Sequence, residues 1–382
     1  MLMPRWLYYL PGMAVVAPAL ALIWRSQQAS LAIFICSTLA LIPLAALIGR
    51  ATEDLEPYVG PIAGGLLNAT FGNAPELIIG IFALRAGLIT VVQASLTGSI
   101  ISNSLLVLGS SLALGGWRWG RQYFNARDAG QYSAMMLLAL AGLLIPSTGS
   151  LVIRDQDRLQ AMSVAISLVL LAVYVLYLIA HVFHVRTERR NPKRRAQTAK
   201  LRDPAPEEEE ELVADLSGQS EAHERKGQPA RLWLTLAVLL IGTLGTAWNS
   251  ELLVGTINPV THQLGWSPIF VGLVIIPIVG NAAEHSSAVY IALRDHVDLS
   301  MAIAAGSSIQ VATFVAPMLV IASVFFSMPL DLVFQPLELV ILGVAVLLYS
   351  VVSLDGQSSW LAGVQLVTVY LIACIVFFFI PG

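Results

Sequence analysis

The stretch FGNAPELIIG, from Phe71 to Gly80, places an asparagine, a proline and a glutamate inside a long apolar run. The stretch VGNAAEHSSA, from Val279 to Ala288, repeats its pattern Gly-Asn-x-x-Glu later in the chain. The two patterns are 208 residues apart, and the pair Gly98-Ser99 recurs at the same distance. The sequence therefore predicts two related halves, each with one glutamate in apolar surroundings.

The composition is that of an integral membrane protein. Of the 382 residues, 57% are hydrophobic and 12% are charged, and the mean hydropathy is +0.76. Soluble domains contain roughly 25% charged residues, so this chain has too few to cover a globule of its size. We expect a lipid bilayer around it and no nucleic-acid partner. Cys36 and Cys374 lack metal-ligand spacing, so we expect both to pack among apolar residues, and we expect no cofactor.

Eleven segments are long and apolar enough to cross a membrane, which takes about 20 residues. We expect the first to be a retained helix and not a cleaved signal peptide. Several contain glycine or proline, which is tolerated where neighbouring helices or a wet cavity satisfy the freed backbone groups. The segments are 7–24, 30–49, 60–84, 88–115, 130–147, 161–184, 232–253, 266–293, 297–326, 334–352 and 359–380.

Residues 186–231 form a polar linker between the halves. A basic run over 186–200 is followed by an acidic run over 207–216, which is either part of a solvated linker or a short amphipathic helix. Seventeen of the 21 Lys and Arg residues fall on the side of the N-terminus and this linker. The positive-inside rule therefore predicts that both are cytoplasmic. The acidic run opens with Glu207, Glu208, Glu209, Glu210 and Glu211.

The two halves each contain five of the predicted spans. Residues 1–29 hold the first helix and a short loop, residues 30–185 hold spans 2 to 6, and residues 232–382 hold spans 7 to 11. An odd number of spans makes the two copies insert in opposite orientations. This is the inverted-topology repeat of secondary transporters, whose site lies near the midplane at broken helices. We expect an all-α polytopic fold with helices broken at the two motifs.

The two motif glutamates, Glu76 and Glu284, have two interpretations. Asn-x-x-Glu is the spacing of a capping box, in which Asn73 would cap a helix and Glu76 would reach back to a backbone N–H. However, a carboxylate near the bilayer centre costs about 2.5–3.5 kcal/mol, whereas a cap contributes about 1 kcal/mol. We therefore interpret the two glutamates as a functional pair.

Two carboxylates are hard oxygen ligands that suit Ca²⁺, which takes about six to eight oxygens. We expect Ca²⁺ as a transported substrate, with further oxygens from polar side chains near the motifs. For the serines, hydrogen bonding within their own helix or close helix packing is an open alternative. The candidate ligands beside the two glutamates are Asn73, Asn281, Ser99, Asn103, Ser307 and Gln310.

Protons are expected to compete with the cation for the glutamate pair. An apolar site with a like charge nearby favours protonated carboxyl groups, and a divalent cation reverses that balance. Competition for one site is what antiport requires. Glu53 and Glu251, one span before each motif, are either vestibule or proton-relay groups or charges at helix ends. His285 either takes part in proton transfer or packs as a neutral residue.

The stretches GGLLNATFGNAPELIIGIFAL, ASLTGSIISNSLLVLG, PIVGNAAEHSSAV and GSSIQVATFVAP resemble the signature repeats of the cation/proton exchanger family, the Ca²⁺/H⁺ antiporters of the Ca²⁺/cation antiporter superfamily. The resemblance covers spans 2 to 11. It implies eleven helices arranged one plus five plus five, with a regulatory acidic helix at 207–211. It also implies that Glu76 and Glu284 are the central cation and proton ligands, surrounded by the six polar residues named above.

From these residues and this resemblance we predict a secondary transporter that exports Ca²⁺ in exchange for H⁺, in a prokaryotic plasma membrane. Na⁺-coupled exchange or broader use of cations such as Mn²⁺ stays open, as does a cation channel. No nucleophile–base set indicates an enzyme. The sequence leaves the formation of a homo-oligomer open.

Overall fold

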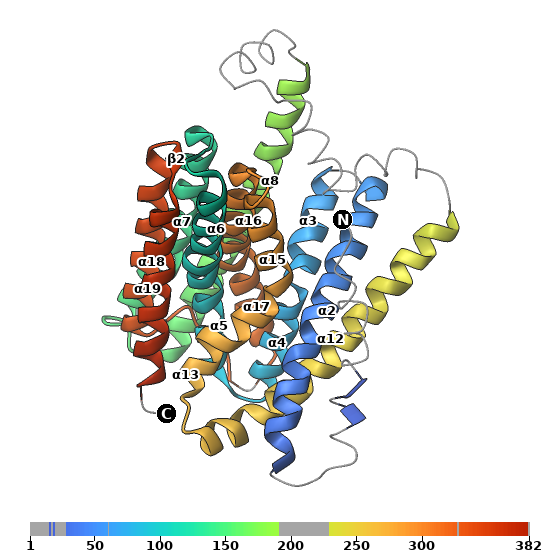
Figure 1. Ribbon diagram of the computed structural model, residues 1–382. Coiled ribbons are helices and arrows are strands. Elements are labelled where there is room, and N and C mark those ends of the chain that lie inside the picture. Colours follow the sequence, from blue (N-terminus) through green and yellow to red (C-terminus); the bar gives the residue numbers. More distant parts are fainter. Residues whose placement is uncertain are drawn as a thin grey trace.

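Figure 1 shows a computed structural model of the protein, in which long helices lie side by side in a bundle. The structure describes residues 15–16, 18–19, 28–59, 61–190, 229–326 and 328–380. Two short strands, β1 (Gln122–Tyr123) and β2 (Gln357–Ser358), pair antiparallel at one end of it. The predicted all-α membrane fold is confirmed.

The first half breaks where its motif predicts. Helix α3 ends at Gly72, Asn73 interrupts it, and α4 begins at Ala74 with Pro75 in its first turn. Proline is tolerated there because the first turn of a helix has no partner for its N–H groups. The elements of this half are α2 (Gln28–Val59), α3 (Pro61–Gly72), α4 (Ala74–Arg85), α5 (Ile89–Ile101), the π-helical segment η3 (Ser102–Val107), α6 (Leu108–Trp119), α7 (Ala126–Gly149) and α8 (Gln156–Arg190).

The second half repeats this order of helices, with a further π-helical segment in the helix that precedes its break. Its motif helix breaks at Asn281, and the two parts are bent by 60°. The elements are α12 (Pro229–Leu264), α13 (Pro268–Phe270), the π-helical segment η4 (Val271–Ile275), α14 (Ile276–Gly280), α15 (Ala282–Ala292), α16 (Val297–Gln310), the π-helical segment η5 (Val311–Val315), α17 (Ala316–Ser323), α18 (Pro336–Leu354) and α19 (Trp360–Phe378).

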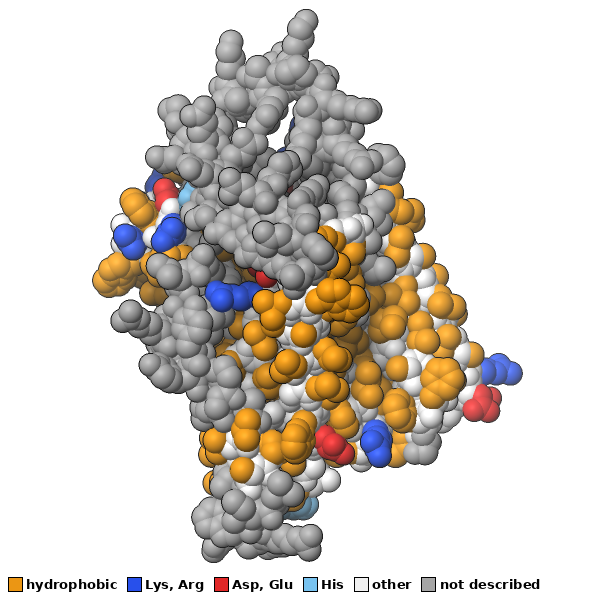
Figure 2. Space-filling view, turned by 90° about the vertical axis from the view of Figure 1, so that its right-hand side faces the viewer, with side chains coloured by type: hydrophobic (Ala, Val, Ile, Leu, Met, Phe, Trp, Pro, Cys, Tyr) orange, Lys and Arg blue, Asp and Glu red, His pale blue; other side chains and the backbone are white. Residues whose placement is uncertain are grey.

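By length and composition, eight helices in the described part of the chain could cross a membrane, or nine if the bent pair at Asn281 counts as one span. On the coloured part of the face in Figure 2, hydrophobic side chains predominate and charged ones are few. The predicted span 7–24 lies almost wholly outside the described residues, and so does most of the linker, including Glu207 to Glu211. The count of eleven and the domain boundaries stay predictions.

Small residues let helices approach closely in this bundle. A Cβ atom at Gly109 of α6 would lie 2.9 Å from the carbonyl oxygen of Gly363 in α19. Such contacts are typical of membrane helices, which gain van der Waals packing where backbones meet. The equivalent helices α2 and α12 also cross in contact with each other (Figure 1).

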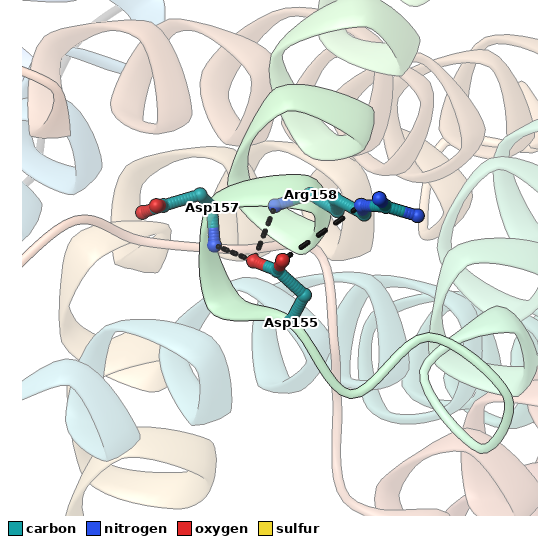
Figure 3. Close-up of polar contacts among 3 residues, drawn as sticks. All are labelled: Asp155, Asp157 and Arg158. Carbon is teal, nitrogen blue, oxygen red and sulfur yellow. Dashed lines mark hydrogen bonds and ion pairs between the residues drawn. The ribbon is translucent and has the colours of Figure 1, made fainter.

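The bundle has two distinguishable ends. We call the end where α8 reaches Arg190 the linker end, and the end that holds the α7–α8 loop the far end. At the far end Asp155 caps α8, because its Oδ1 accepts hydrogen bonds from the N–H groups of Asp157 at 3.0 Å and Arg158 at 3.3 Å (Figure 3). The guanidinium Nε of Arg158 lies 3.7 Å from Asp155 Oδ2. Residues 328–335 also lie at the far end, because the backbone N–H groups of Leu332 and Phe334 donate hydrogen bonds to the hydroxyl groups of Ser163 and Ser147.

Candidate functional site

The asparagine at the first break does not cap its own helix. Asn73 occupies the N-cap position with φ −100° and ψ 20°, but its side chain makes no capping hydrogen bond. Its Nδ2 donates instead to Gln310 Oε1, at 2.8 Å, on α16 of the other half. The capping-box interpretation is therefore not supported here, and the Asn73 side chain links the two halves.

The asparagine at the second break behaves in the same way. Asn281 Nδ2 donates to Ser99 Oγ on α5 at 3.3 Å, and to the Pro277 carbonyl oxygen of its own half at 3.2 Å. Each broken helix thus contacts, through its asparagine, the helix that follows the motif in the opposite half. This crossed arrangement brings both breaks to one place between the halves.

Asn103 connects further predicted residues at this place. Its Nδ2 donates to Ser307 Oγ at 2.9 Å, and its Oδ1 lies 3.1 Å from His285 Nε2. Ser307 Oγ in turn lies 3.5 Å from Asn281 Oδ1. All of these side chains come from helices that flank the breaks, so the polar groups form one network inside apolar walls.

Two π-helical segments adjoin this network at matching positions of the halves. Segment η3 includes Asn103, and η5 begins directly after Gln310. A π-helical turn inserts an extra residue and rotates the side chains that follow, and such turns occur often at functional sites. The sequence showed no signal for these two segments.

The Glu76 carboxyl group lies against the break of the other half. Its side chain is 8% exposed, and a Cβ atom at Gly280 would lie 2.7 Å from its Oε1. Among the described residues neither carboxylate oxygen has a hydrogen-bond partner, and the same holds for Oε2 of the partly buried Glu284. The two glutamates are close enough for their charges to interact. Buried polar atoms normally have partners, so these oxygens are open to a cation or a proton.

The remaining predicted residues are placed as follows. Glu53 and Glu251 are exposed side chains on α2 and α12, and their proposed roles stay predictions. Within the described ranges no group of three or more His, Cys, Asp or Glu side chains could hold a metal. The described site consists of two carboxyl groups with neutral amide and hydroxyl groups around them.

Our sequence reasoning missed two buried features near this site. The hydroxyl groups of Ser104 and Ser308 lie 3.5 Å apart between the halves. Glu338 on α18 is 1% exposed and accepts a hydrogen bond from Thr97 on α5. The signal for Glu338 was present, because it is a glutamate in a predicted span, and the cost argument used for Glu76 applies to it equally.

The two halves pack differently on either side of the site. Towards the far end, a Cβ atom at Gly98 of α5 would lie 2.6 Å from the Cα of Leu273 in η4. One at Gly272 would lie 2.7 Å from the Val91 carbonyl oxygen. Gly306 is the counterpart of Gly98 on α16, and a Cβ atom there would meet no atom of the described residues within 4 Å. Helix α5 is thus closely packed at Gly98, whereas α16 is not closely packed at the equivalent Gly306.

Known proteins resemble this chain over most of its length. The sequence model of the sodium/calcium exchanger protein family matches residues 29–183 and 234–379. The chain is 45% identical over 358 residues to the Ca(2+)/H(+) antiporter of Synechocystis sp., covering 91% of each protein. It is 42% identical over 352 residues to the Ca(2+)/H(+) antiporter ChaA of Bacillus subtilis, covering 91% of this chain and 92% of the relative.

Solved structures show the same fold. The structure of native YfkE superposes with a TM-score of 0.78 at 36% identity, covering 98% of this chain and all of that one. The H⁺/Ca²⁺ exchanger CAX superposes with a TM-score of 0.65 at 16% identity, covering 97% of this chain and 91% of the other.

Proposed function

Because the chain belongs to the sodium/calcium exchanger protein family, we propose that it exports Ca²⁺ in exchange for H⁺ by alternating access. The antiporter relatives and the inverted repeat support this function. The observation that carries it is the Glu76 carboxyl group, which is buried against Gly280 with both oxygens unpartnered in the described structure. The resemblance to the cation/proton exchanger family is consistent with the relatives.

The exchange follows from competition for the glutamate pair. Two carboxylates balance the charge of Ca²⁺, and the oxygens of neighbouring amides and hydroxyls complete its coordination. With Ca²⁺ absent, the two buried carboxyl groups are held neutral by protons, because isolated charges in apolar surroundings are costly. Binding of Ca²⁺ therefore releases protons, and binding of protons releases Ca²⁺. We propose that further residues around the glutamates either bind the cation directly or hydrogen-bond to the side chains that do. These residues are Asn73, Asn281, Ser99, Asn103, Ser307 and Gln310.

Alternating access would use the unequal packing of the two halves. The contact of α5 with η4 at Gly98 closes the path towards the far end, and the looser surroundings of Gly306 leave the linker end open. We propose a plasma-membrane location with the linker in the cytoplasm, as the distribution of Lys and Arg predicts. In that orientation the site receives Ca²⁺ from the cytoplasm, and the acidic segment 207–211 lies on that side as a regulatory element.

Reconstituted protein tests this proposal. We expect proteoliposomes with an imposed pH gradient to take up radiolabelled Ca²⁺, and Glu76→Gln to abolish that uptake because an amide neither balances Ca²⁺ nor carries a proton. Asp157→Asn, which removes an exposed carboxyl group of α8, serves as the matched control and should retain uptake. A Na⁺ gradient without a pH gradient should drive no uptake. Undiminished transport by Glu76→Gln, or uptake driven by Na⁺ alone, would contradict the proposal.

A further inference from the structure

Glu338 is a buried carboxyl group that the proposed exchange mechanism does not use. It is the third residue of α18 and is 1% exposed. Its Oε2 accepts a hydrogen bond from Thr97 Oγ1 at 2.8 Å, and its Oε1 has no hydrogen-bond partner among the described residues. The group therefore has one neutral donor and a free oxygen in an apolar setting.

The helices packed against α18 bring no counter-charge close to Glu338. Helix α5 and segment η3 contain no titratable side chain. Asp331 lies in the loop before α18, and its Oδ1 accepts a hydrogen bond from Gln93 Nε2 at 3.1 Å. Burial raises the pKa of Asp331. The titratable groups on α7 and α19 are Arg127, Asp128, Tyr132, Tyr370 and Cys374.

The groups on α7 lie in its first turns, towards the linker end, because Ser147 near the other end of α7 accepts a hydrogen bond from Phe334 in the far-end loop that precedes α18. No described side chain thus compensates an ionised Glu338. A carboxylate that is buried with a single neutral hydrogen bond costs far more than that bond returns. These surroundings favour the neutral, protonated form of the Glu338 carboxyl group over the ionised form.

The matching helix of the other half carries a carboxyl group at the same place, but without this hydrogen bond. Glu338 and Asp128 are each the third residue of their helix, α18 and α7. Thr97 corresponds to Ala305 under the 208-residue repeat, so α16 offers no hydroxyl donor at that position. The hydrogen bond between Thr97 and Glu338 has no equivalent in the other half. The repeat therefore does not explain why this pair is present.

The pair sits beside the contact that distinguishes the two halves. Thr97 precedes Gly98, whose backbone packs against Leu273 of η4. If α5 separates from η4 to open the far end, Thr97 moves with it and the hydrogen bond to Glu338 changes. Because binding equilibria are reciprocal, the position of α5 and the proton on Glu338 must then influence each other.

We propose that Glu338 is a further proton-binding residue of the exchange cycle, which releases and regains its proton as α5 moves against η4. The inference rests on the proposed Ca²⁺/H⁺ exchange. It adds a second proton site, outside the cation site, towards the far end of the bundle.

The variant Glu338→Gln tests this proposal, because glutamine keeps an acceptor for Thr97 but cannot ionise. We expect the protein to fold and transport, with uptake that varies less with pH than in the wild type. We also expect the number of protons moved per Ca²⁺ to fall by up to about one. A wild type without uptake driven by a pH gradient would overturn the exchange function itself. A transporting wild type with the same pH profile and proton ratio as Glu338→Gln would overturn this inference alone.

Infrared difference spectroscopy on the purified protein gives an independent readout. Adding Ca²⁺ to the wild type should remove a protonated-carboxyl band that Glu338→Gln lacks. Thr97→Ala keeps the carboxyl group but loses its donor, so the band should move to higher wavenumber. A Glu338 band that neither Ca²⁺ nor pH changes would assign the residue to packing and overturn the proposal.

Discussion

At the scale of single residues, the two motif asparagines decide how the breaks meet. Each has the N-cap position of its helix, yet Asn73 donates to Gln310 and Asn281 donates to Ser99, both across the boundary between the halves. Either asparagine could have capped its own helix at little cost. Their use across the boundary joins the two breaks, so that Glu76 lies directly on the backbone of Gly280.

The contact between Glu76 and Gly280 gives a prediction at this scale. Gly280→Ala would place a Cβ atom 2.7 Å from Glu76 Oε1, so the carboxyl group must move. We expect the Ca²⁺ concentration for half-maximal uptake to rise about tenfold or more, which corresponds to about 1.4 kcal/mol of binding. The measurement is the concentration dependence of Ca²⁺ uptake in proteoliposomes.

Gly255→Ala on α12 is the control for that substitution, since a Cβ atom there meets no described atom within 4 Å. It should leave the half-maximal concentration unchanged. Equal effects of the two substitutions would show that the Glu76–Gly280 contact does not determine cation affinity.

At the scale of elements, the broken helices and the π-helical segments share one purpose, which is to expose polar groups inside the bundle. A regular helix would leave no gap in the backbone at Asn73 or Asn281, and the π-helical turns at η3 and η5 change the direction of the side chains that follow them. Helix α5 and segment η4 approach each other at two glycines, Gly98 and Gly272, which bring the two backbones close together.

The contact of α5 with η4 yields the prediction at this scale. Gly98→Ala would force a Cβ atom to within 2.6 Å of the Leu273 Cα, and backbone cannot yield as a flexible side chain can. We expect a loss of about 1–3 kcal/mol in the free energy of unfolding, as for other overpacked positions. Thermal unfolding in detergent should show a lower Tm.

Gly306→Ala is the matched variant in the other half, because no described atom lies within 4 Å of its Cβ position. Its Tm should stay near that of the wild type, while transport slows if Gly306 packs closely in the opposite state. The same fall in Tm for both variants would contradict the unequal packing of the two halves.

At the level of the complete bundle, the inverted repeat explains how one site could open to either side of the membrane in turn. Two copies inserted in opposite orientations have equivalent packings available, and a small change exchanges which half is closely packed. The unequal surroundings of Gly98 and Gly306 are one of these two arrangements.

We predict that the linker lies in the cytoplasm and that the far-end loop between α7 and α8 lies outside the cell. In a background without Cys36 and Cys374, we expect Val152→Cys, in the far-end loop, to react with a membrane-impermeant maleimide on intact cells. Ser217→Cys, in the linker, should react only after the cells are permeabilised. The physical reason is the excess of Lys and Arg on the linker side. Labelling of Ser217→Cys in intact cells would reverse the assignment.

The membrane class, the positions of the two breaks and the two motif glutamates beside them could all be predicted from the amino-acid sequence. These follow from local features, namely hydropathy, the Asn-Pro pattern at Asn73 and the cost of a carboxylate in an apolar run. Ten of the predicted spans correspond to helices, although the helices extend several residues beyond the predicted bounds at polar ends such as that of α2.

Which groups meet across the two halves could not be predicted from the sequence and follows from how the helices pack. The bond from Asn73 to Gln310, the contact of Glu76 with Gly280 and the pair Thr97–Glu338 each join residues more than 200 positions apart. The tertiary structure also decided that Gly98 is packed and Gly306 is not, although the two positions have the same local sequence pattern. The reason is that a repeat specifies two equivalent local structures, whereas packing between the repeats selects one arrangement of them at a time.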